Sequence, residues 1–195
     1  MYIQRSIDQQ LLEWKQSSVH KPLLLRGARQ VGKSSAIRHL GETFKHYIEV
    51  NFEKRPELKE LFEKTSDVHQ LAARLGMLYN VPIEAGKTLV FLDEIQACPE
   101  AIKSLWFFKE DFPELHVVAA GSLLEFALKE LTSYGVGRIR SLFMYPLSFD
   151  EFLQAQGKAS WIEEKRKADH NHPLFEALHQ ELVQQYRTFL MVGGM

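Results

Sequence analysis

The chain has 195 residues, 45% of them hydrophobic and 25% charged, and its 24 Lys and Arg nearly balance its 25 Asp and Glu. This composition is typical of a globular domain: it excludes a disordered chain and gives no overall positive charge that would indicate nucleic-acid binding. The length suits one α/β core with roughly forty residues left for an appendage.

The N-terminus and the cysteine content bear on the cellular compartment. Residues 1–12 carry Arg5, Asp8 and three glutamines, so they lack the apolar segment of a signal peptide. No run approaches the ~18 apolar residues of a membrane span. Cys98 is the only cysteine, which excludes an internal disulfide. We therefore expect a cytoplasmic protein.

Short apolar runs alternate with longer segments of helical period, as in a parallel sheet with crossover helices. Five runs rich in Leu, Val, Ile or Phe are predicted strands: 22–26, 47–52, 88–92, 116–120 and 141–145. Helical spacing between them is shown by Ile37, Leu40 and Phe44, by Val68, Leu71, Leu75 and Leu78, and by Ile102, Leu105 and Trp106 after Pro99. The pattern predicts an α/β fold with a doubly wound, mainly parallel five-stranded sheet.

Helical segments flank this pattern at both ends. Ile7, Leu11 and Trp14 predict an N-terminal helix packed on the core. Residues 150–167 are helical and charged, residues 169–173 interrupt the pattern, and a second apolar stripe follows at Leu174, Leu178, Leu182, Tyr186 and Phe189. We expect a core over residues 1–149 and a small C-terminal helical lid over residues 150–195.

The clearest motif follows the first predicted strand and precedes a predicted helix. It matches G-x-x-x-x-G-K-S/T and consists of Gly27, Ala28, Arg29, Gln30, Val31, Gly32, Lys33 and Ser34. Glycines let the backbone curl around a phosphate, and the new helix offers unpaired N–H donors. Lys33 would reach the β- and γ-phosphates, Ser34 would ligate Mg²⁺, and Ser35 would contact the α-phosphate. The structural alternative is a glycine-rich turn that caps a helix.

Two carboxylates end the third predicted strand, at the sheet edge where parallel sheets place ligands. Asp93 would hold Mg²⁺, and Glu94 would polarise the attacking water. A solvated acidic turn is the structural alternative. With the upstream loop, the pair predicts hydrolysis of ATP. No guanine-reading Asn-Lys-x-Asp motif is evident, so ATP is the default nucleotide.

Weaker candidates follow the fourth strand. Ser122 would hydrogen-bond the γ-phosphate as a sensor, or serve as a helix N-cap. Arg138 and Arg140 lie between the fourth and fifth predicted strands, where a guanidinium would act as an arginine finger toward a neighbouring subunit or be solvated on a surface turn. His170 and His172 have no metal-ligand spacing and indicate a polar loop.

Together these residues resemble the prokaryotic AAA-like P-loop ATPases of the AAA_14 type, which usually carry a C-terminal domain called DUF4143. The resemblance rests on residues 26–34, 50–53, 92–96, 119–126 and 145–149. The resemblance implies the P-loop fold with a catalytic glutamate. The family's nucleotide-binding and catalytic positions correspond to Gly32, Lys33, Ser34, Asp93 and Glu94. Ser122 corresponds to a sensor, and Arg138 lies in a Val-Gly-Arg segment.

The sequence departs from the family pattern at one position, and its last residues are similar to a family junction. Family members usually have Pro where this chain has Gly135. Residues 186–195 are similar to the family's Gly-Gly-Met-Pro junction, so we expect a C-terminal region to be truncated here. That region would recognise a nucleic acid or protein partner.

Three functions compete at this point. The leading one is a Mg²⁺-dependent ATPase whose hydrolysis drives a conformational change, acting as a homo-oligomer. The alternative is a nucleotide-gated binding switch with little turnover. A P-loop kinase would need an arginine-rich lid, of which the segment after Phe149 gives little sign.

Overall fold

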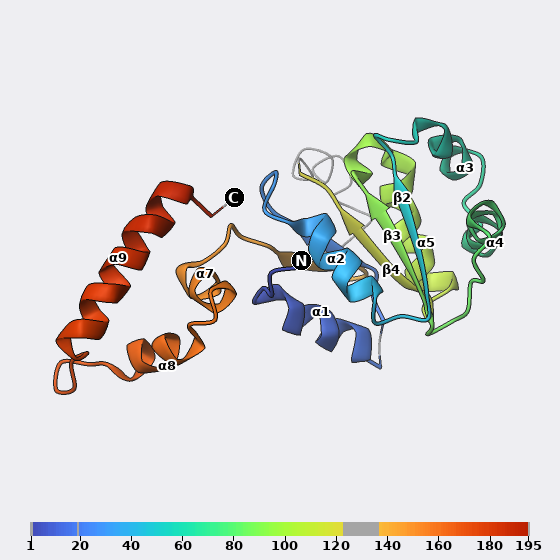
Figure 1. The fold of residues 1–195 in the computed structure, drawn as a ribbon. Helices are drawn as coiled ribbons and strands as arrows, with labels where there is room; N and C mark the ends of the chain where they lie inside the picture. Colours follow the sequence, from blue (N-terminus) through green and yellow to red (C-terminus); the bar gives the residue numbers. More distant parts are fainter. Residues whose placement is uncertain (1, 19, 123–136, 195) are drawn as a thin grey trace. The chain divides into compact units, whose positions relative to one another are not determined.

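The computed structural model describes residues 2–18, 20–122 and 137–194 of the chain (Figure 1). The backbone forms two compact units, one over residues 7–144 and one over residues 1–6 together with 145–195. We call them the sheet unit and the helical unit. In these described ranges, no helix is long and apolar enough to cross a membrane.

Five parallel strands form the sheet, in the spatial order β2-β3-β4-β1-β5. They are β1 (Leu23–Arg26), β2 (His46–Asn51), β3 (Thr88–Asp93), β4 (His116–Ala120) and β5 (Arg140–Phe143). Every residue of β3 and β4 is buried, as expected for central strands covered on both faces. The predicted α/β fold is therefore confirmed: the bounds of β4 are as predicted, and those of the other strands differ by at most two residues.

Helices precede and connect the strands and cover both faces of the sheet (Figure 1). They are α1 (Ile7–Gln16), α2 (Lys33–Gly41), α3 (Lys59–Glu63), α4 (Val68–Tyr79) and α5 (Pro99–Asp111), with short 3-10 turns η1 (Pro56–Leu58) and η2 (Ile95–Ala97). The predicted N-terminal helix buries Ile7, Leu11 and Trp14. Pro99 lies in the first turn of α5, as predicted.

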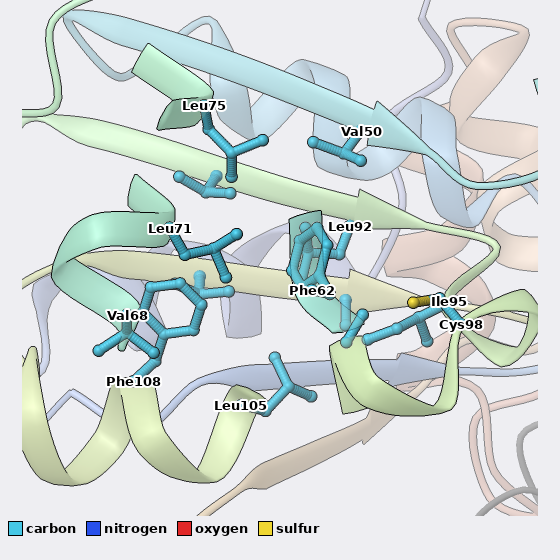
Figure 2. Packing of buried hydrophobic residues seen from close by; sticks show 14 of the residues in the cluster. Val50, Phe62, Val68, Leu71, Leu75, Leu92, Ile95, Cys98, Leu105 and Phe108 are labelled. Atoms are coloured by element: carbon cyan, nitrogen blue, oxygen red, sulfur yellow. The ribbon is translucent and has the colours of Figure 1, made fainter. Parts of the chain in front are cut away.

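The main apolar core lies between the sheet and helices α3, α4 and α5 (Figure 2). Val50 and Leu92 from the strands pack in the same cluster as Leu71 and Leu75 of α4 and Leu105 of α5. Leu78 was predicted to share this face, and that prediction is wrong: its exposed fraction is 49%. It lies in the last turn of α4, after which Asn80 turns the chain with φ 50°.

Three helices make up most of the helical unit: α7 (Phe149–Ala155), α8 (Ala159–Lys167) and α9 (Glu176–Val192). The sequence predicts one helix over residues 150–167, but the chain breaks between α7 and α8. Gly157 takes φ 74°, a left-handed conformation that ends a helix, and Lys158 N–H donates to the Leu153 carbonyl. Leu153 packs with Ile162, Leu178 and Leu182 in a small core.

Candidate functional site

The glycine-rich loop joins β1 to α2 in the position that the motif requires. Gly27 takes φ 147°, and a Cβ atom there would lie 2.2 Å from the Met144 carbonyl oxygen, so only glycine fits beside β5. Gln30 and Gly32 also have positive φ angles, of 64° and 97°. The loop is therefore a curled segment bent by local left-handed conformations, as phosphate-binding loops require.

Helix α2 begins at Lys33, directly after the loop. The first N–H groups of an α-helix have no carbonyl partner within the helix. At the start of α2 these groups, and the positive end of the helix dipole, therefore face the loop. The Lys33 ammonium is buried and donates to the carbonyls of Gly27 at 3.0 Å and Ala28 at 2.7 Å. Burial lowers the pKa of Lys33, while the nearby charges of Glu94 and Asp93 act in the opposite direction.

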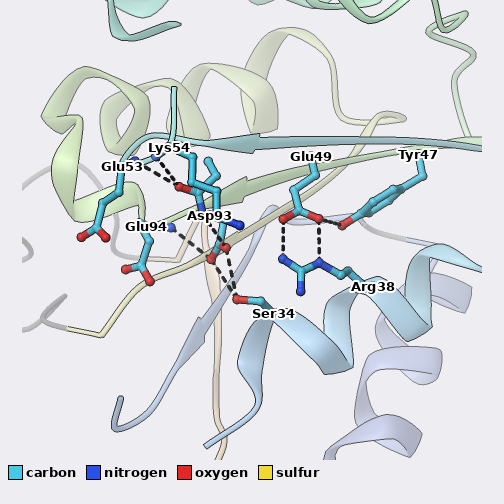
Figure 3. Close-up of polar contacts among 9 residues, drawn as sticks. Ser34, Arg38, Tyr47, Glu49, Glu53, Lys54, Asp93 and Glu94 are labelled. Atoms are coloured by element: carbon cyan, nitrogen blue, oxygen red, sulfur yellow. Dashed lines mark hydrogen bonds and ion pairs between the residues drawn. The ribbon is translucent and has the colours of Figure 1, made fainter. Parts of the chain in front are cut away.

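Asp93 ends β3 and is the centre of a hydrogen-bond cluster (Figure 3). Its carboxylate accepts from the Ser34 hydroxyl at 3.1 and 3.2 Å, from Asn51 Nδ2 at 2.9 Å and from the Glu94 N–H at 3.1 Å. Asp93 is only 4% exposed. Burial raises its pKa, the Ser34 and Asn51 hydrogen bonds oppose that increase, and the Glu94 charge adds to it.

Asn51 belongs to the cluster although the sequence did not single it out as a site residue. It ends β2 and pairs in register with Asp93 across the parallel ladder. Its Oδ1 accepts from the N–H groups of Glu53 and Lys54, which leaves Nδ2 directed at Asp93. A polar residue that closes a strand at the same sheet edge was the available signal.

A second polar group joins β2 to α2 next to this cluster (Figure 3). Arg38 Nε and its terminal nitrogen donate to the two oxygens of Glu49 at 2.9 and 2.6 Å, and the Tyr47 hydroxyl donates to Glu49 at 2.9 Å. The Arg38 hydrogen bonds hold the pKa of Glu49 below its ordinary value, although burial opposes them. A bidentate pair of this kind fixes the edge strand against the helix that follows the loop.

Glu94 follows Asp93 in a left-handed conformation, with φ 50° and ψ 45°, and precedes η2. The side chain is half-buried, and its Oε2 accepts from Gln96 Nε2 at 2.7 Å. Like Asn51, Gln96 was not singled out as a site residue. The available signals were its position two residues after the acidic pair and its place in residues 92–96, one of the stretches that carry the family resemblance.

The structure brings Lys33, Ser34, Asp93 and Glu94 to the carboxyl edge of the sheet, as the sequence predicts. Ser35 is exposed in the first turn of α2. Ser122 follows β4, the strand that lies between β1 and β3, so its half-buried side chain is at the same edge. Residues 123–136, which include Gly135 and the segment that Ser122 was predicted to cap, lie outside the described part of the chain.

The arginines have other partners in this structure. Arg138 Nε donates to Glu110 at 2.8 Å, and its guanidinium lies 5.3 Å from the Trp106 ring centre, both on α5. Arg140 begins β5, and its N–H donates to the Pro22 carbonyl. His172 belongs to a turn organised by Asp169, and over the residues that the structure describes, no group of three His, Cys, Asp or Glu could hold a metal ion.

The oxygen donors at Ser34 and Asp93 nevertheless suit Mg²⁺, which usually takes only one or two carboxylates or hydroxyls from a protein and keeps several waters. Two protein ligands are therefore enough, and the donor set fits this ion.

Comparison with known sequences decides the family. The AAA domain family, AAA_14, matches residues 19–153. The chain belongs to this family. The match covers the glycine-rich loop, the acidic pair and all five strands, and it confirms the resemblance drawn from the motifs. No curated protein sequence matches the chain.

Three solved structures are similar in fold to this chain. A Walker-type ATPase of Pyrococcus abyssi aligns with a TM-score of 0.53 at 19% identity, over 97% of this chain and 74% of that one. The ORC2 protein of Aeropyrum pernix, in ADPNP–ADP complexes, has a TM-score of 0.52 at 12% identity, over 82% of this chain and 53% of its own. The ORC1 protein of Aeropyrum pernix, in complex with DNA, has a TM-score of 0.50 at 15% identity, over 81% and 50%. The AAA chain therefore spans about half the length of the ORC proteins, and at these identities the likeness shows the P-loop ATPase fold alone.

Proposed function

We propose that this AAA domain binds ATP with Mg²⁺ and hydrolyses it. One observation carries the proposal. Ser34 and Asp93 belong to two motifs and are 59 residues apart in sequence, yet the Ser34 Oγ lies 3.1 Å from the Asp93 Oδ1. Lys33 precedes Ser34 in the sequence, and Glu94 follows Asp93. A hydroxyl and a carboxylate at this separation are the protein ligands that a nucleotide-bound Mg²⁺ uses in P-loop enzymes.

Each residue then has a distinct task. The loop N–H groups and the start of α2 would hold the phosphates, and the Lys33 ammonium would exchange the Gly27 and Ala28 carbonyls for phosphate oxygens. Ser34 and Asp93 would hold Mg²⁺, which when bound would neutralise charge on the phosphates. Glu94 would accept a proton from the water that attacks the γ-phosphorus as the bond to ADP breaks. Ser122 would donate a hydrogen bond to the γ-phosphate.

Paired variants test these tasks separately. Glu94→Gln should bind ATP normally but hydrolyse it about 10²–10⁴-fold more slowly, because an amide cannot take the proton. Lys33→Ala should abolish detectable ATP binding, whereas Lys167→Ala, an exposed lysine on α8, should change nothing. Calorimetry measures the binding and single-turnover phosphate release measures the chemistry. Wild-type hydrolysis by Glu94→Gln would contradict the assignment of the base.

We also propose that hydrolysis is coupled to a conformational change and that Arg138 acts as a finger in an oligomer. In this structure Arg138 pairs with Glu110, so a finger would have to exchange that carboxylate for a phosphate. A finger in trans is worth ~10³-fold or more in turnover. Activity per molecule should therefore rise with concentration, and mixing Arg138→Ala with Glu94→Gln should restore activity. A dead mixture and concentration-independent activity would contradict the finger.

The remaining parts of the proposal are the nucleotide, the place and the partner. ATP is proposed as the nucleotide because the sequence carries no guanine-reading motif, and the ORC2 neighbour holds adenine nucleotides. We propose that the domain acts in the cytoplasm and that its nucleotide state controls binding to a nucleic acid or protein. The nucleotide retained on purification, read by mass spectrometry, tests the first of these.

A further inference from the structure

We propose that Gln96 is a positioning residue that aims the Glu94 carboxylate at the attacking water. The inference rests on the proposed function, and it names a residue that controls how the same site works. Gln96 Nε2 donates to Glu94 Oε2 at 2.7 Å, a short hydrogen bond from a neutral amide to a carboxylate.

The backbone between the two residues holds them in this arrangement. Glu94 is the residue before the 3-10 turn Ile95–Ala97, and the Ala97 N–H donates to the Glu94 carbonyl at 3.0 Å. Ile95 is completely buried in the main apolar core, and Cys98 is 1% exposed there. A turn anchored in the core at both ends fixes the backbone of Gln96, and the hydrogen bond to Glu94 together with the burial of Oε1 holds its amide in place.

The other end of the Gln96 amide shows what determines its orientation. Oε1 is buried and has no hydrogen-bond partner within the described residues. A buried carbonyl oxygen in this state is unfavourable and calls for an explanation. Rotating the amide by 180° would place Oε1 against the Glu94 carboxylate, which also accepts and carries negative charge. The amide is therefore oriented so that Nε2 donates to Glu94, and Oε1 is left without a hydrogen bond to any described residue.

Glu94 itself needs such a partner. Its left-handed backbone, at φ 50°, is uncommon for a residue other than glycine, and strain of this kind concentrates at functional sites. The Glu94 N–H donates to the Asp93 carboxylate, which fixes the Glu94 backbone next to the proposed Mg²⁺ ligand. Gln96 then holds Oε2, so Oε1 is the oxygen that we assign to the water.

The test compares variants of the whole chain under single-turnover conditions with saturating ATP and Mg²⁺. Gln96→Met keeps the length of the side chain and removes the donor, and Gln96→Glu replaces the donor with a repelling carboxylate. Both should lower the hydrolysis rate, Gln96→Met by about 10- to 100-fold, the range expected when a catalytic group is misplaced by up to an ångström. Dissociation constants for ATP should stay within about 2-fold, because Gln96 is not one of the proposed phosphate ligands.

Two comparisons separate positioning from a structural role. Gln180→Met is the matched control, because Gln180 Nε2 also donates to a glutamate, Glu176, at 2.8 Å on the surface of α9, and it should leave the rate unchanged. In the Glu94→Gln background, Gln96→Met should cause no further loss, since the two residues act as one unit. Gln96→Asn keeps the donor on a shorter side chain, gives a second test if Gln96→Met does not fold, and should show a smaller loss.

Several results would overturn the inference. A wild-type rate for Gln96→Met, a higher rate that marks Gln96 as an inhibitory restraint, or an equal loss in the Glu94→Gln background would each do so. If these occur while Glu94→Gln is inactive and the wild-type chain hydrolyses ATP, only the role of Gln96 fails. If the wild-type chain releases no phosphate, the proposed function fails and this inference with it.

Discussion

Two buried carboxylates, one in each unit, have pKa values shifted in opposite directions. In the sheet unit, burial raises the pKa of Asp93, and its hydrogen bonds offset only part of that effect. In the helical unit, burial would also raise the pKa of Glu151, but the Ser148 and Ser6 N–H groups and Arg5 lower it to about 2. Their exposed fractions are similar, at 4% and 9%.

The difference lies in what each carboxylate bonds. Glu151 completes a capping box with Ser148 at the start of α7 and also ties down the arm before α1, so its charge is satisfied by the protein itself. Asp93 accepts from three donors but faces the Glu94 charge. We infer that Glu151 stabilises the fold, whereas the charge of Asp93 is under-compensated by its own hydrogen bonds, at a cost in stability.

Removing Glu151 should have the largest effect on stability. Glu151→Ala leaves two N–H groups and the Arg5 guanidinium without their carboxylate, which should cost about 2–4 kcal/mol. Hydrogen exchange should speed up in α7 and in residues 2–6. Glu164→Ala, an exposed glutamate on α8 paired with Lys167, is the control and should cost less than about 0.5 kcal/mol. Equal effects would remove the contrast between the two carboxylates.

Acid should destabilise the two units in different pH windows. Burial lowers the pKa of His116 in the sheet unit to about 4 from an ordinary value of 6.5. The folded state therefore binds fewer protons between these values, and stability falls as pH drops from 6.5 to 4, by on the order of 1–3 kcal/mol.

Glu151 affects stability at lower pH. Its stabilising contribution to folding is present above its ordinary pKa of 4.5 and is lost as pH falls toward about 2. Chemical unfolding followed at several pH values, with signals from each unit, measures both windows. His116→Phe should remove the upper one, whereas replacing the exposed His179 should not. A single window shared by both units would contradict this assignment.

Asp93→Asn should have the smallest effect on the fold and the opposite sign. Because the folded-state pKa of Asp93 is raised, the folded protein binds more protons, and stability falls as pH rises through that pKa. At neutral pH the ionised carboxylate therefore costs stability, and the amide should raise the unfolding free energy without nucleotide by about 1 kcal/mol, or Tm by ~2–4 °C. ATP and Mg²⁺ should then no longer raise Tm. A lower Tm without nucleotide would show that Asp93 is not under-compensated.

Residues whose position depends on local chain geometry could be placed from the sequence. A glycine-rich loop between a strand and a helix positions Lys33 and Ser34 through backbone conformations within eight residues, and an apolar run ending in Asp93 and Glu94 places them at a strand end. The five strands were found for the same reason, since burial on both faces leaves a continuous apolar run.

Tertiary structure decided the partners of several key polar side chains. The parallel register sets Asn51 beside Asp93, a turn anchored in the core sets Gln96 against Glu94, and the arm before α1 brings Arg5 to Glu151. The sequence predicted that Arg138 could reach a neighbouring subunit, whereas in the structure it pairs with Glu110 on α5. Each of these choices depends on side-chain contacts made across the folded backbone. A hydrophobic pattern carries no information about such contacts, because it specifies which face is buried and not which polar groups meet.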